Sequence, residues 1–190
     1  LCYVQVTRGI AERDFNFAKN SSSPTVVIFT QEKLILSNPA SKVGIKIITV
    51  PDDRWRRRDI KTTQLLAQSL AKTHAVKKGV DDCLLVQDDC INEGSSSNVF
   101  IIKDESIATP SLSNDILVGI TRSSVIQFCK INNIEIKEQK IKINDLMDAQ
   151  EVFLTSATGF VLPVIEIDGK QVGNGLVGNR VKEIQRIYLE

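Results

Sequence analysis

The chain has 190 residues, enough for one or two modest domains with a buried core. Hydrophobic residues make up 42% and charged residues 25%, a composition that is ordinary for a globular protein. A formal net charge of +1 gives no strong attraction to nucleic acid or to an anionic membrane, and no run approaches the roughly 18 apolar residues of a membrane span. We therefore expect neither nucleic acid nor membrane as a partner.

The first third of the chain is predicted to consist of strands joined by loops. The β-rich runs lie at 2–7, 25–30 and 44–50. Polar residues at 19–24 separate the first two runs. We expect a boundary that divides the chain into a leading piece, 1–38, and a main domain, 39–190. The basic stretch at 54–58 is expected to be solvated or to lie at an interface.

The rest of the chain alternates helices and strands. Apolar residues at helical spacing predict helices at 62–77, 121–132 and 178–188. Leu65, Leu66 and Leu70 recur at this spacing in the first helix, and Val125, Ile126 and Cys129 share one face of the second. Strands are predicted at 82–87, 98–103, 106–109, 134–139, 151–155 and 161–167. Because strands outnumber helices and tight turns join several of them, we expect an α+β fold with a largely antiparallel or barrel-like sheet.

Cysteine and histidine give no sign of a metal site. The four cysteines are Cys2, Cys83, Cys90 and Cys129, and none of them forms a CxxC pair. His74, the single histidine, falls on a predicted helix. We expect free thiols, a cytoplasmic protein and no bound metal.

Four segments place polar residues at the ends of predicted elements. Lys61 lies just before a helix, where a side chain can be held rigidly and still reach a cleft. Glu93 opens a small polar loop, 93–98, that runs into a strand. The segment 117–122 begins a helix whose free N–H groups are suited to a phosphate, and 155–159 is a second small polar loop. Each segment alone is also explained as a solvated lysine, a Ser-rich turn, an N-capping threonine or a plain turn.

Taken in chain order, these segments form one composite motif. It consists of Asp59-Ile60-Lys61, then Glu93-Gly94-Ser95-Ser96-Ser97-Asn98-Val99-Phe100, then Ile107-Ala108-Thr109, then Leu117-Val118-Gly119-Ile120-Thr121-Arg122. The motif resembles the extended signature of class IV aminotransferases, which depend on pyridoxal 5'-phosphate (PLP). Together with Gln5-Val6-Thr7-Arg8-Gly9, it is most similar to the D-amino-acid aminotransferases. The resemblance implies a fold-type IV enzyme, with a C-terminal pseudo-barrel domain at 39–190 and the tail of a smaller N-terminal α/β domain at 1–38.

The resemblance also implies PLP as cofactor and a role for each segment. Lys61 matches the lysine that forms a Schiff base with PLP, and its amine can act as general base and acid once substrate displaces it. Glu93 matches the carboxylate that pairs with the pyridine nitrogen and keeps it protonated. The remaining cofactor matches are Ile120, Thr121, Ser156 and Ala157 at the phosphate, Ser96 and Ser97 in a loop near the cofactor, and Leu117 against its ring.

Two positions depart from the family pattern. Arg13 matches the arginine that binds the substrate carboxylate from the partner subunit, but Phe15 stands where the family motif has a histidine. Ala157 stands where related enzymes carry a threonine or a similar donor. The carboxylate site is thus incomplete, so class membership is better supported than specificity for D-amino acids.

The expected activity is transfer of the amino group of a D-amino acid, such as D-alanine, to a 2-oxo acid such as 2-oxoglutarate, by a homodimer. A 4-amino-4-deoxychorismate lyase and a branched-chain aminotransferase remain alternatives that would use the same Lys61 and Glu93. A non-catalytic module that keeps the fold is a third. We also expect that the chain lacks most of the smaller domain, with its phosphate-binding arginine and active-site tyrosine, and that alone it binds PLP weakly or not at all.

Overall fold

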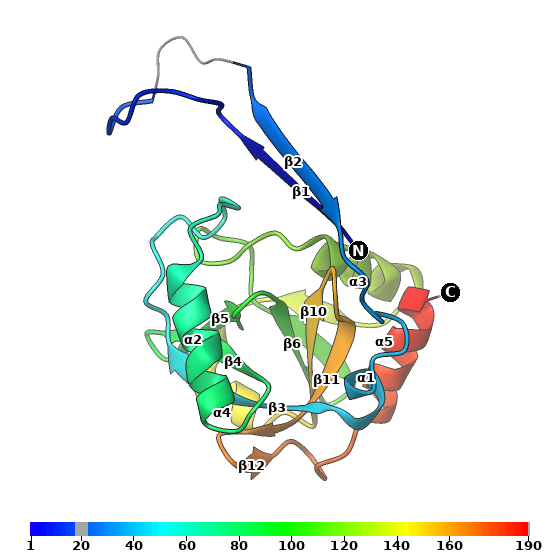
Figure 1. Ribbon diagram of the computed structural model, residues 1–190. Helices are drawn as coiled ribbons and strands as arrows, with labels where there is room; N and C mark the ends of the chain where they lie inside the picture. The colour runs from blue at the N-terminus through cyan, green and yellow to red at the C-terminus, as the bar shows by residue number, and fades with distance from the viewer. Residues whose placement is uncertain (18–22, 190) are drawn as a thin grey trace. The chain divides into compact units, whose positions relative to one another are not determined.

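The computed structural model describes residues 1–17 and 23–189 (Figure 1). The predicted polar loop at 19–24 therefore lies mostly outside the described residues. The chain divides into two compact units, Leu1–Leu36 and Ser37–Glu190.

The first unit contains one antiparallel strand pair. β1 (Cys2–Thr7) pairs with β2 (Thr25–Thr30) from Cys2 opposite Thr30 to Thr7 opposite Thr25. Both predicted strands are confirmed. Tyr3 and Phe29 face each other across the pair with ring centroids 4.8 Å apart, a cross-strand aromatic contact of the kind that stabilises hairpins.

The second unit is built on a ten-stranded sheet in residues 37–189. Its strands are β3 (Ile45–Pro51), β4 (Asp82–Gln87), β5 (Cys90–Gly94), β6 (Asn98–Lys103), β7 (Ser106–Thr109), β8 (Ile136–Glu138), β9 (Ile141–Lys142), β10 (Glu151–Ser156), β11 (Phe160–Ile167) and β12 (Lys170–Gln171). They lie in the order β8-β7-β6-β10-β11-β3-β4-β5-β9, and β12 pairs with β11. Most neighbours are antiparallel, and only β11–β3, β3–β4 and β7–β8 are parallel.

The sheet curls strongly. β5 and β6 are far apart in the strand order, yet they contact each other (Figure 1). The predicted α+β fold with a largely antiparallel, barrel-like sheet is confirmed. Only residues 95–97 join β5 to β6, so the sheet has to curl for these two strands to take their places in it. The predicted Glu93 segment lies at this connection.

Five helices accompany the sheet within residues 37–189. They are α1 (Ala40–Val43), α2 (Leu66–Lys77), α3 (Ile120–Ile131), α4 (Ile143–Met147) and α5 (Asn179–Leu189). Val125, Ile126 and Cys129 of α3 are buried together with Val181 and Ile184 of α5, against the apolar side chains of β6 and β10. The predicted apolar face of α3 is therefore confirmed. None of the helices in the described part of the chain is long and apolar enough to cross a membrane.

The first predicted helix is wrong in its start. α2 begins at Leu66, not at residue 62, and the backbone N–H of Gln64 donates to Thr62 Oγ1 at 3.3 Å. Such a local bond competes with helical hydrogen bonding, so the turn before α2 stays irregular. Leu66 and Leu70 are exposed, whereas the small Ala75 packs on the sheet, because alanine lets the helix approach closely.

The short elements were not predicted. Each of these five elements contains only two to five residues, too few to show a clear helical or strand period; they are α1, α4, β5, β9 and β12.

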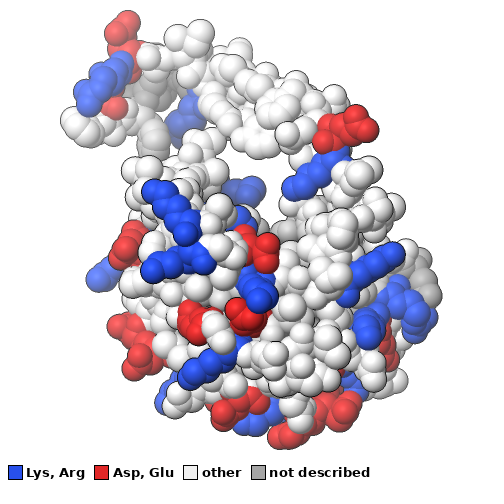
Figure 2. Space-filling view, turned by 60° about the horizontal axis from the view of Figure 1, so that its bottom comes forward, with Lys and Arg blue, Asp and Glu red and all other residues white. Residues whose placement is uncertain are grey.

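On the face of the molecule that Figure 2 shows, acidic and basic side chains are interspersed, in keeping with the formal net charge of +1.

Candidate active site

Glu93 is a buried carboxylate at the end of β5, with 4% of its surface exposed. Its Oε2 atom accepts hydrogen bonds from Asn98 Nδ2 and from the backbone N–H of Leu117, both at 3.0 Å. Its Oε1 atom accepts one from Arg54 Nη1. Two residues of the composite motif, Glu93 and Leu117, are thus brought into direct contact although 24 positions separate them.

A tight turn after β5 brings Asn98 next to the Glu93 carboxylate. The N–H of Gly94 donates to the carbonyl of Ser97 at 2.7 Å, which returns the chain so that Asn98 begins β6 beside Glu93. A Cβ atom on Gly94 would collide with Ser97 Oγ, so the turn requires glycine. Ser95 Oγ donates to Asp82 Oδ1 at 2.6 Å and ties the turn to β4.

Burial and a neighbouring cation act on the ionisation of Glu93 in opposite directions. Burial raises the pKa of Glu93 above its ordinary value of 4.5, while the charge and hydrogen bond of Arg54 and the N–H of Leu117 lower it. Burial is the larger effect. A carboxylate has about four acceptor positions, and three donors use three of them, so Oε1 keeps one position for a further donor.

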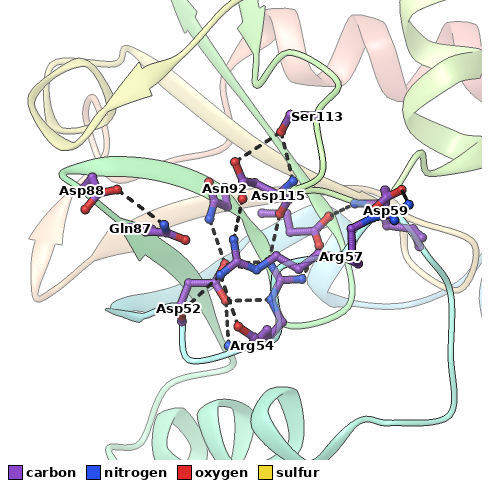
Figure 3. Close-up of polar contacts among 12 residues, drawn as sticks. Asp52, Arg54, Arg57, Asp59, Gln87, Asp88, Asn92, Ser113 and Asp115 are labelled. Carbon is purple, nitrogen blue, oxygen red and sulfur yellow. Dashed lines mark hydrogen bonds and ion pairs between the residues drawn. The ribbon is translucent and has the colours of Figure 1, made fainter.

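The prediction that the basic stretch at 54–58 is solvated or at an interface is wrong for Arg54 and Arg58. The side chains of Arg54 and Arg58 are 5% and 4% exposed. They lie among carboxylates, because Arg54 contacts both Asp52 and Glu93 and Arg58 contacts Asp115 at 2.7 Å (Figure 3). Buried charges need such partners, and acidic residues from distant parts of the chain supply them. Trp55, Arg56 and Arg57 are exposed as predicted, and Arg57 pairs with Asp59 at 2.9 Å.

Asn98 is a central residue of the site that the sequence reasoning missed. Its Nδ2 atom donates to Glu93 and, at 2.9 Å, to the carbonyl of Leu117. Its Oδ1 atom lies against Gly119, the N-cap of α3, where a Cβ atom would collide with it. Asn98 thereby joins the Glu93 carboxylate to the first turn of α3. Its place inside the Ser-rich motif was the signal that could have identified it.

The N-terminus of α3 carries two predicted phosphate residues, Ile120 and Thr121. The N-cap is Gly119 and no side chain caps the helix, so Thr121 is not the N-cap that one alternative required. The free N–H groups and the positive end of the helix dipole favour an anion here. Ile120 is exposed, whereas Thr121 is buried with its hydroxyl 3.5 Å from that of Tyr188.

The second predicted phosphate loop lies at the same end of the sheet. β10 and β6 are antiparallel neighbours with Thr155 opposite Asn98, so Ser156 and Ala157 follow directly beyond the start of β6. Ser156 Oγ accepts the N–H of Gly159 at 3.0 Å and Ala157 is exposed. Ser96, in the turn before β6, is exposed as well.

Two buried hydroxyl groups flank Asn98 without a partner among the described residues. They are Ser97 Oγ, one residue before it, and Thr155 Oγ1, on the neighbouring strand. Buried polar groups are nearly always hydrogen-bonded, so these two hydroxyl groups mark a place where a bound molecule could supply a hydrogen-bond partner.

No contact in the described part of the second unit brings Lys61 to this group. Lys61 is exposed in the loop between β3 and α2, five residues before α2 begins, and it forms no hydrogen bond or ion pair with any residue that the structure describes. Arg13 belongs to the first unit, where its guanidinium lies 5.2 Å from the centre of the Phe15 ring. Phe15, the departure from the family motif, is therefore its local neighbour.

The sequence profile described as "Amino-transferase class IV" matches residues 2–167 of the chain. The chain belongs to the class IV aminotransferase family. It is 37% identical over 185 residues to the D-alanine aminotransferase of Staphylococcus haemolyticus, an alignment that covers 96% of this chain and 64% of the relative. It thus spans about 64% of the length of the curated relatives it matches.

Solved structures of class IV aminotransferases share the fold. A branched-chain amino acid aminotransferase with pyridoxamine 5'-phosphate, from the organism abbreviated T.th., matches with a TM-score of 0.87 and 28% identity, over 100% of this chain and 64% of that one. The branched-chain aminotransferase of Escherichia coli matches with a TM-score of 0.82 and 25% identity, over 97% of this chain and 63% of that one. The predicted fold class is confirmed.

The groups around Glu93 fit the cofactor of class IV aminotransferases. Three carboxylates, on Asp52, Glu93 and Asp115, share the two guanidinium groups of Arg54 and Arg58. Asp115 is half exposed to solvent, so the buried part of the network is the pair of carboxylates on Asp52 and Glu93 with the two guanidinium groups. The free position on Glu93 Oε1 could accept a hydrogen bond from a protonated pyridine nitrogen. The uncapped N-terminus of α3 offers N–H groups to a phosphate.

The described residues contain no group of three histidine, cysteine or acidic side chains that could hold a metal ion.

Proposed function

We propose that the protein is a PLP-dependent aminotransferase that moves the amino group of a D-amino acid, such as D-alanine, to a 2-oxo acid such as 2-oxoglutarate. The observation that carries the proposal is the buried Glu93 carboxylate, which keeps one acceptor position and is hydrogen-bonded to Leu117, close to the uncapped N-terminus of α3. Relatives that are 37% identical over 96% of the chain are named D-alanine aminotransferases, which supports the choice of substrate.

The predicted site residues then take the following parts. When bound, PLP supplies a protonated ring that withdraws electrons from the substrate Cα. Glu93 keeps the proton on the ring nitrogen. The amine of Lys61 holds the cofactor covalently and, once released, takes the proton from Cα of the substrate.

The residues that would hold the phosphate are Ile120 and Thr121 of α3 and Ser156 and Ala157 after β10, and the departure at Ala157 leaves only a backbone N–H there. The loop residues Ser96 and Ser97 lie beside this end of the sheet. Leu117, whose N–H is fixed by Glu93, would pack against the ring. We propose residues 39–190 as the PLP-binding domain.

Arg13 is proposed to bind the substrate carboxylate of the partner subunit in a cytoplasmic homodimer. Its guanidinium is a strong and permanently charged ligand for a carboxylate. With Phe15 in place of histidine, the carboxylate keeps one charged partner fewer, so we expect weaker binding of the amino donor than in relatives with the full motif.

Branched-chain amino acids are the second candidate substrates. The solved structures with TM-scores of 0.87 and 0.82 are branched-chain aminotransferases, and the same Lys61 and Glu93 would serve either donor. The sequence relatives favour D-alanine, because they are more similar in sequence, at 37% identity against 25–31% for the branched-chain aminotransferases of solved structure.

The test is to incubate the protein that carries this chain with PLP, 2-oxoglutarate and one donor at a time. We expect pyruvate from D-alanine, and no 2-oxo acid from L-leucine. A Lys61→Ala variant is the matched control and should give no pyruvate. Turnover of L-leucine alone would favour the branched-chain activity, and release of pyruvate from 4-amino-4-deoxychorismate alone would favour the lyase.

A further inference from the structure

Arg54 lies between two buried carboxylates, Asp52 and Glu93. Its Nε and Nη2 atoms donate to the two oxygens of Asp52, each at 2.8 Å, and its Nη1 atom donates to Glu93 Oε1 (Figure 3). The side chains of Asp52, Arg54 and Glu93 are 0%, 5% and 6% exposed. The three charged side chains therefore contact one another in series and are almost fully buried.

We propose that Arg54, held in a fixed plane by Asp52, is the positioning residue that keeps Glu93 ionised and aims it at the ring nitrogen of the cofactor. The proposal rests on the function proposed above. Arg54 is assigned no contact with cofactor or substrate; it acts through Glu93.

Glu93 needs a nearby cation because its burial and the second anion, Asp52, both disfavour its charged form. The Asn98 Nδ2 and Leu117 N–H donors favour that form, but both donors are neutral. Arg58 is taken up by Asp115 and by Asp52, at 3.4 Å from the latter. Arg54 is thus the one cation that contacts Glu93 among the described residues. A protonated Glu93 would donate to the ring nitrogen and leave the ring neutral.

The geometry requires arginine and not only a positive charge. The planar guanidinium uses one edge for Asp52 and its remaining nitrogen for Glu93, so fixing the first contact directs the second. Asp52 is fixed in turn by Asn92 Nδ2, at 2.8 Å, and by the Arg54 backbone N–H, at 3.2 Å. A lysine would keep the charge but has no rigid edge with which to meet both carboxylates.

The first measurement needs no cofactor. Glutamate labelled with 13C in its carboxylate is followed by NMR across a pH titration of the protein without PLP, and the Glu93 signal is assigned by its loss in a Glu93→Gln variant. We expect the midpoint for Glu93 to rise in Arg54→Met, because the cation that opposes burial is gone. Arg57→Met is the matched control: the same residue type in the same loop, half exposed and paired with Asp59. It should leave the midpoint unchanged.

The second measurement concerns the cofactor. The protein is incubated with increasing PLP and reduced with borohydride, and the label on Lys61 is quantified by peptide mapping. In both Arg54→Met and Arg54→Lys, half-maximal labelling should need about 10- to 100-fold more PLP, the size of loss known for the outer partners of metal ligands. Arg54→Lys should raise the Glu93 midpoint less than Arg54→Met, because the charge remains. If Arg54→Met does not fold, Arg54→Lys carries the test alone.

The outcomes separate the two proposals. If wild-type protein is labelled on Lys61 and the Arg54 variants need no more PLP than Arg57→Met, or leave the Glu93 midpoint unchanged, the role of Arg54 is refuted and the proposed function stands. If wild-type protein is not labelled on Lys61 at all, the proposed function falls and the role of Arg54 falls with it.

Discussion

Asp52 is the residue whose ionisation the structure determines most clearly. Burial alone would raise the pKa of Asp52, but the hydrogen bonds from Arg54 and Asn92 and the charges of Arg54 and Arg58 outweigh it, so the pKa lies below the ordinary value of 3.8. A depressed pKa of an acid contributes stability that is present above its unfolded pKa and is lost as the pH falls through the folded one.

Asp52→Asn should therefore destabilise the protein in a pH-dependent way. At pH 7 we expect the free energy of unfolding to fall by roughly 3 kcal/mol, since one partner of a buried ionic network is removed. Urea unfolding measures this difference. It should shrink as the pH drops below 3.8, because Asp52 of the unfolded wild-type chain then takes up a proton, while folded Asp52 stays ionised down to its lower pKa. Asp148→Asn, at an exposed pair with Lys103, is the control and should change little at either pH. A difference that stays constant as the pH is lowered through this range would contradict the depressed pKa.

Single residues also show which features of the site the sequence could predict and which it could not. Glu93 and Leu117 were assigned through the composite motif, and the structure places them in contact. The burial of Arg54 and Arg58 could not be predicted, because a run of basic residues is usually solvated and its acidic partners lie up to 57 positions away in the chain. Pairing at such distances follows from the fold and leaves no local pattern.

At the scale of elements, the approach of β6 to the start of α3 is the contact that organises the site. Gly119 is at the N-cap of α3, and its backbone torsions are ordinary, with φ of −69°. Glycine is required there only because Asn98 Oδ1 occupies the space of a Cβ atom.

Gly119→Ala should thus cost about 1–3 kcal/mol of stability, the usual range for forcing extra volume into a packed site. The cost should largely vanish in an Asn98→Ala background, where the side chain that collides is gone. A double-mutant cycle by urea unfolding measures this coupling. If the two substitutions are additive, Asn98 and Gly119 are not in the contact that the structure shows.

Long, patterned elements could be predicted from the sequence, and short or weakly patterned ones could not. β4, β6 and β7 have the predicted bounds, and α3 and α5 differ by one residue at each end. The sequence predicts only a loop from Glu93 onward, although Glu93 belongs to the five-residue strand β5. The predicted start of α2 is four residues too early because the turn at Thr62 has helix-forming neighbours.

At the scale of the whole chain, the mixed fold and a largely antiparallel or barrel-like sheet were predictable, but the order of the strands was not. Alternation and turn residues indicate strands and their antiparallel neighbours, whereas they do not show that β5 and β6, joined only by residues 95–97, lie far apart in the strand order. We therefore expected the motif segments to lie close together only from the resemblance to the family. The register of β6 with β10, which places Thr155 opposite Asn98, explains why the segments around Asn98 do so.

The four cysteines provide a test of the packing of the chain. Burial raises the pKa of the Cys83 thiol, under α2, and of the Cys129 thiol, on α3, to about 11 each. Both should be unreactive toward a thiol reagent such as 5,5'-dithiobis(2-nitrobenzoate) at about pH 8 until the protein unfolds. Cys2 is exposed and should react fast, and the half-buried Cys90 more slowly. Rapid modification of all four thiols in native protein would contradict the packing.

The central claim is that Lys61 holds PLP, and one measurement tests it directly. The protein that carries this chain is incubated with PLP, reduced with borohydride and digested, and the modified peptide is identified by mass spectrometry. We predict a single phosphopyridoxyl group, on Lys61, and its loss in Lys61→Ala, while Lys72→Ala on α2 is labelled as wild type. A stoichiometric label on another lysine, or no label on folded protein at saturating PLP, would contradict the account.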